Sequence, residues 1–130
     1  MTTPTTTKEL LAITPASYPA QAALWAAEAR ADAARYYRRA RKCERDARRW
    51  DEAARLSDKN ADFYERHTAD DDPEFAALCA ERAPESRDAA EGWRALAAAE
   101  RRHAPDWRKL GAAAAKRARG FQAIADGKTE

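Results

Sequence analysis

The side chains best suited to binding chemistry are seven of the eight cations between residues 35 and 49. In a helix, a period of 3.6 residues would place all of them on one side. We call this set the arginine stripe: Arg35, Arg38, Arg41, Lys42, Arg45, Arg48 and Arg49. It would extend for about 20 Å along a helix. Guanidinium groups form bidentate contacts with phosphate oxygens, and each neutralised phosphate releases counterions. The stripe therefore predicts a protein that binds nucleic acid phosphates without strong sequence preference.

Two other interpretations of the stripe stay open. It can be an ordinary solvated helix face, partly paired with Glu44, Asp46 and Asp51. It can also serve a small helical adaptor or inhibitor that binds another protein through a charged helix face. In that case the acidic stretch is a second candidate surface: Asp70, Asp71, Asp72 and Glu74. The sequence contains no helix-turn-helix, zinc-finger or basic-zipper spacing that would decide among them.

Two motifs resemble metal sites, and both lack what a metal requires. Glu100-x-x-His103 is half of a di-iron carboxylate site, and no second such pair occurs in the sequence. A segment that starts at Asp58 resembles the opening of a calcium loop, but Phe63 and Ala69 stand where glycine and glutamate are needed. There is no glycine-rich phosphate loop and no nucleophile elbow. We therefore expect no enzyme activity, no metal site and no cofactor.

The stripe requires a long helix to hold it. Residues 20–67 contain neither proline nor glycine, and alanine recurs every seventh residue from Ala26 to Ala61. This period predicts a helix packed along its whole length against another helix. Its expected packing seam includes Ala33, Tyr36, Ala40, Cys43, Ala47, Trp50, Ala54 and Tyr64. We expect it to begin at Ser17 or Tyr18, with Pro19 in the first turn, and to end near His67. A break near residues 57–60 is the alternative.

The rest of the chain is expected to pack back against this helix. Asp72 should cap a second helix beginning at Pro73. Interior prolines remove a hydrogen bond and clash with the preceding turn, so Pro84 and Pro105 should divide residues 73–125 into two or three shorter helices. Gly127 should end the last of them. The predicted fold is all-α: an elongated antiparallel hairpin or bundle.

Composition adds limits on class and partners. Alanine exceeds a quarter of the 130 residues, valine is absent, and the net charge of +2 favours no partner by itself. A core built from methyl groups is thin, so we expect a monomer or a homodimer. Cys43 and Cys79 form no Cys-x-x-Cys pair, which favours reduced thiols and a cytoplasmic protein. No apolar run spans a membrane. We expect a flexible tail over 1–16, one helical domain over 17–126 and a short tail over 127–130.

Overall fold

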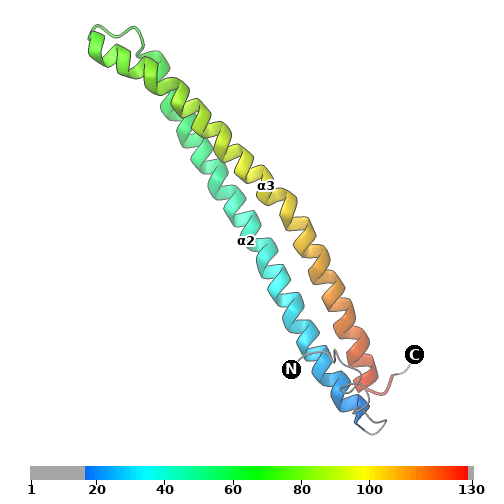
Figure 1. Ribbon diagram of the computed structural model, residues 1–130. Helices are drawn as coiled ribbons and strands as arrows, with labels where there is room; N and C mark the ends of the chain where they lie inside the picture. Colours follow the sequence, from blue (N-terminus) through cyan, green and yellow to red (C-terminus); the bar gives the residue numbers. More distant parts are fainter. Residues whose placement is uncertain (1–16, 129–130) are drawn as a thin grey trace, which may run out of the picture. The chain divides into compact units, whose positions relative to one another are not determined.

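The computed structural model describes residues 17–128, which form two helices, α2 (Tyr18–Arg66) and α3 (Pro73–Ala125) (Figure 1). Helix accounts for 91% of these residues and none of them lies in a strand, so the all-α class is confirmed. The tail expected over residues 1–16 lies outside the described residues, as do residues 129 and 130. Neither described helix has an apolar stretch long enough to cross a membrane.

Helix α2 is continuous from Tyr18 to Arg66. Its first turn is closed by the Ser17 carbonyl, which accepts the Gln21 N–H at 3.0 Å. The alternative of a break near residues 57–60 is wrong. Short polar side chains there compete for backbone hydrogen bonds, but Ala54 and Ala61 on either side are 2% and 0% exposed. Packing on both sides of the polar segment therefore keeps it helical.

Helix α3 corrects the predicted number of helices. Pro84 and Pro105 were expected to interrupt this part of the chain, yet α3 runs through both as one helix of 53 residues. Each proline still removes one backbone hydrogen bond. However, Ala83 and Ala104, which directly precede the prolines, are 5% and 2% exposed. The packing of these alanines against α2 outweighs the local preference of proline, so the expectation of two or three shorter helices is wrong.

The ends of α3 are closed by specific hydrogen bonds. Asp72 Oδ1 accepts the Glu74 N–H at 3.0 Å, which makes Asp72 the N-cap as expected. At the other end, Gly127 adopts a φ of +77°, where residues with a Cβ are strained. The Lys128 N–H then donates to the Ala123 carbonyl at 2.8 Å, and the Gly127 N–H donates to the Ile124 carbonyl at 3.0 Å. This pair of bonds is a Schellman motif.

The described residues fall into two compact units. The first unit combines residues 17–40 with residues 105–128, and the second is Arg41–Ala104. In each unit, a segment of α2 packs antiparallel to a segment of α3. Stacked aromatic rings join the segments: Tyr36 and Trp107 in the first unit, with ring centroids 6.0 Å apart, and Trp50 and Trp93 in the second.

Small side chains let the paired segments approach closely. The alanines of α2 face a second seven-residue repeat on α3, which was not recognised in the sequence. Its buried members are Ala83, Ala90, Ala97, Ala104, Gly111 and Ala118. Among the described residues, the largest fully buried side chain is that of Cys79. The core therefore consists of many small contacts between closely spaced helices, rather than of a few large side chains.

Candidate nucleic-acid interface

All seven residues of the arginine stripe are exposed on α2. Arg35 and Arg38 belong to the first unit, and the other five belong to the second. The seam positions between them on the helix, Ala40 and Ala47, are only 2% and 1% exposed. The remaining predicted seam residues are also buried or half-buried. Helical geometry thus turns the stripe away from the α3 segment that covers the seam.

Most cations of the stripe have no carboxylate partner among residues 17–128. Arg35 pairs with Asp32 at 2.6 Å, and Lys42 pairs with Asp46 at 3.1 Å. The other five form no ion pair with any residue that the structure describes: Arg38, Arg41, Arg45, Arg48 and Arg49.

Four carboxylates of α2 in the second unit face arginines of α3 instead. Arg87 contacts Asp58 at 3.0 Å, and Asp62 and Glu65 at 2.6 Å. Arg94 also pairs with Asp58, and Arg101 pairs with Asp51. We call these contacts the charge ladder. Its arginines recur every seventh residue, as do Asp51, Asp58 and Glu65. That shared spacing was the sequence signal for the ladder, and it was missed.

Two carboxylates of the ladder have lowered pKa values. A hydrogen bond from Arg101 lowers the pKa of the Asp51 carboxyl, and hydrogen bonds from Arg87 lower that of Glu65. The same bonds raise the pKa of both guanidinium groups. The Asp51 carboxyl is therefore ionised at neutral pH and is already bound to the Arg101 guanidinium. In the alternative of a solvated helix face, Asp51 would pair with the stripe, but its partner is Arg101 on the other helix; Asp46 does pair with Lys42 of the stripe.

Aromatic side chains near the stripe are used for packing. Trp50 stacks on Trp93 with centroids 5.2 Å apart, and the Arg39 guanidinium lies 5.0 Å from the centre of the Trp107 ring. The ring of Tyr37 lies against Gly111, where an added Cβ would stand 2.9 Å from the ring.

Burial raises the pKa of the Cys43 and Cys79 thiols, which disfavours the nucleophilic thiolate.

The other sequence motifs take part in local structure. Asp58 and Asp62, from the segment that resembles a calcium loop, bind Arg87 in the ladder. Within residues 17–128, no cluster of His, Cys, Asp and Glu is arranged to hold a metal. In the acidic stretch, Asp70 Oδ1 accepts the Asp72 N–H at 3.0 Å, and Asp72 caps α3. Both side chains therefore organise the turn.

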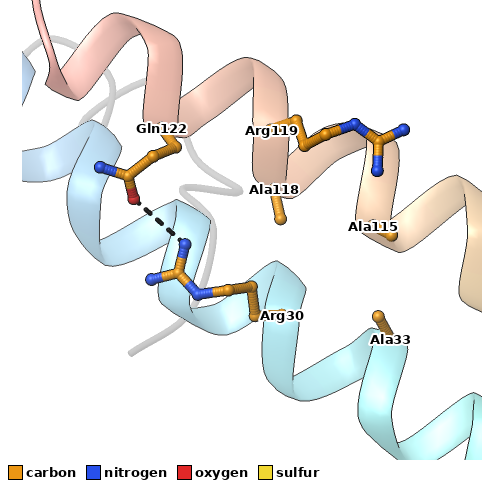
Figure 2. Close-up of a pocket in the computed structure, with 6 residues that line it drawn as sticks. All are labelled: Arg30, Ala33, Ala115, Ala118, Arg119 and Gln122. Carbon is orange, nitrogen blue, oxygen red and sulfur yellow. Dashed lines mark hydrogen bonds between the residues drawn. The ribbon is translucent and has the colours of Figure 1, made fainter.

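A shallow groove of about 460 Å³ lies in the first unit (Figure 2). Ala33, Ala115 and Ala118 line it together with Arg30, Arg119 and Gln122. Arg30 Nη1 donates to Gln122 Oε1 at 3.1 Å, whereas Figure 2 shows the Arg119 side chain extending away from this pair. A ligand site usually has a few polar groups that converge on one place. In this groove Arg30 and Gln122 bond to each other and Arg119 extends away, so no set of free polar groups converges on a ligand position and the stripe is the stronger candidate.

Comparison of the chain with protein-family models, with curated proteins and with solved structures finds no match in any of the three.

Proposed function

We propose that this protein is a non-enzymatic nucleic-acid-binding protein that holds phosphates with the arginine stripe of α2. One observation carries the proposal. Five arginines of the stripe are exposed without a carboxylate partner among the described residues, while Asp51, just past the end of the stripe, pairs with Arg101 of α3. A solvated helix face typically mixes both signs of charge in local pairs. Here Asp51 is taken up by the charge ladder and Asp46 pairs with Lys42, and five arginines of the stripe are left without a carboxylate partner among the described residues.

The physical chemistry of the stripe predicts how binding depends on salt. Each phosphate neutralised by an arginine releases condensed counterions. Binding through about five phosphates should therefore weaken by several hundredfold, roughly, between 50 and 200 mM salt. The exposed arginines contact the phosphate backbone and not a defined set of base edges, so affinity should vary little with sequence.

Fluorescence anisotropy with labelled DNA and RNA at the two salt concentrations tests the proposal. The test variant combines Arg41→Glu, Arg45→Glu and Arg48→Glu, and it should lose about a hundredfold or more in affinity at low salt. The control variant makes the same change of charge on exposed residues of α3, with Arg82→Glu, Arg102→Glu and Arg117→Glu. A long-range effect of net charge alone would weaken binding equally in both variants.

Stability measurements check that the test and control variants are both folded, so that a loss of affinity reports on binding. Substitution of exposed residues without a partner should change the free energy of unfolding by less than about 0.5 kcal/mol per site. Urea unfolding followed by circular dichroism should therefore show folded proteins in both cases. The proposal fails if the protein does not bind at 50 mM salt, or if both variants lose the same affinity. A protein partner that survives nuclease treatment in a pull-down, and is lost with the test variant, would instead support the adaptor hypothesis.

A further inference from the structure

The five cations of the stripe in the second unit form two rows with one residue between them. Arg41 and Arg48 make one row, Lys42 and Arg49 make the other, and Arg45 lies between the rows. Each row repeats after seven residues, or about 10.5 Å along the helix. Consecutive residues of a helix differ by about 100° around its axis, so the two rows diverge toward opposite flanks of the same exposed face. All five side chains are exposed, and Lys42 alone among them has a carboxylate partner within the described residues, Asp46 at 3.1 Å, which a phosphate would have to displace.

Two rows of cations on opposite flanks of a helix fit the phosphates of two nucleic-acid strands better than those of one. A single nucleic-acid strand presents one line of phosphates, which one row would follow. A duplex presents a line of phosphates on each side of a groove. The major groove of B-form DNA, about 12 Å wide, admits an α-helix of about 10–12 Å diameter. The major groove of A-form RNA is deep and too narrow for side chains to read.

The surroundings of the rows also disfavour a single strand. Proteins that bind single strands offer aromatic side chains on which unpaired bases stack. Residues 41–49 contain no aromatic residue. The neighbouring Trp50 is half-buried and already stacked on Trp93, with the two ring planes 6° apart. In the second unit, α3 covers Cys43 and Ala47 on the opposite side of α2, so it leaves the cationic face open to a groove.

We infer, resting on the function proposed above, that the ligand is a B-form DNA duplex whose major groove receives this face of α2. Arg41 and Arg48 hold the phosphates of one strand, and Lys42 and Arg49 hold those of the other. Arg45 lies between the two lines of phosphates. Lys42 and Arg49 therefore contribute as much to phosphate binding as Arg41 and Arg48 do.

The experiment compares three labelled probes of equal length and sequence: a 24-base-pair DNA duplex, one of its single strands and the corresponding RNA duplex. At 100 mM salt, the DNA duplex should bind at least about tenfold more tightly than either of the others. Two double variants then test the rows separately: Arg41→Glu with Arg48→Glu, and Lys42→Glu with Arg49→Glu. Each should weaken duplex binding to a similar extent and lower the salt slope by about 2.

The possible results separate this inference from the proposed function. Equal or tighter binding of the single strand overturns the duplex inference and leaves phosphate binding intact. Equal binding of the RNA duplex overturns the placement in the major groove. An effect of only one double variant overturns the assignment of two strands to two rows. Absence of binding to all three probes overturns both the inference and the proposed function.

Discussion

The indole rings of Trp50 and Trp93 stack face to face, with centroids 5.2 Å apart and planes inclined by 6°. This contact joins α2 to α3 in the second unit, where the seam otherwise consists mainly of alanine and cysteine. Because a methyl group buries little surface, we expect the indole pair to supply a large share of the stability of this unit.

Replacing Trp93 by alanine should lower the free energy of unfolding by about 2–4 kcal/mol, because the half-buried indole and its stacking are both lost. Urea unfolding monitored at 222 nm measures the change. Leu96→Ala is a matched control: this side chain is 45% exposed and should cost less than about 1 kcal/mol. Similar losses in the two variants would show that the stack has no special role.

Gly111 and Gly120 should respond in opposite ways to alanine. Alanine normally stabilises a helix by about 1 kcal/mol relative to glycine. Gly120 has open space around it, so Gly120→Ala should raise the melting temperature. At Gly111 the new Cβ would lie 2.9 Å from Tyr37 Cε1, so Gly111→Ala should lower it. Combining Gly111→Ala with Tyr37→Ala should remove the clash, and the absence of any such rescue would contradict this explanation.

The prolines inside α3 should limit its stability. Pro84 and Pro105 are exposed, and each leaves a backbone carbonyl without its helical partner. Pro84→Ala and Pro105→Ala should therefore each raise the free energy of unfolding, by about 1–3 kcal/mol. Thermal unfolding followed by circular dichroism measures both variants. A loss of stability in either one would mean that the local geometry set by the proline is needed for packing against α2.

The charge ladder should make the protein less stable in acid. Arg101 and Arg87 lower the pKa of Asp51 and Glu65 in the folded state, so the unfolded state binds more protons near pH 4. The ladder's contribution is therefore complete above about pH 5 and is lost as the pH falls through the folded-state pKa values. Melting temperatures measured between pH 7 and pH 3 should fall.

The variant Arg87→Gln isolates this effect. It should melt lower than the parent at pH 7, and the difference should shrink toward pH 3 and in 1 M salt, where exposed ion pairs are screened. Arg82→Gln is the control, since Arg82 is exposed and belongs to none of the ladder contacts. A difference between Arg87→Gln and the parent that does not change with pH would exclude the electrostatic explanation.

The arginine stripe shows how much of the site could be predicted from the sequence. The periodicity of a helix is sufficient to place Arg41, Arg45 and Arg48 opposite Ala40 and Ala47, and they are exposed as that geometry requires. The partners of nearby acidic residues could not be obtained in this way. Asp51 lies within reach of the stripe along the chain, yet it pairs with Arg101, fifty residues away. The register between α2 and α3 determines which arginine pairs with Asp51.

Local sequence by itself determined that the chain is helical, where α2 begins and how α3 is capped, because each depends on neighbouring residues such as Pro19, Asp72 and Gly127. Only the tertiary structure decided that α3 continues through Pro84 and Pro105, and that Gly111 is a contact point for Tyr37. Proline disfavours a helix because it removes one backbone hydrogen bond and its ring clashes with the preceding turn. The alanines beside these prolines are held in place by packing against a neighbouring helix. The helix-breaking preference of proline amounts to a few kcal/mol, and it is overcome when contacts between residues far apart in the chain favour a continuous helix.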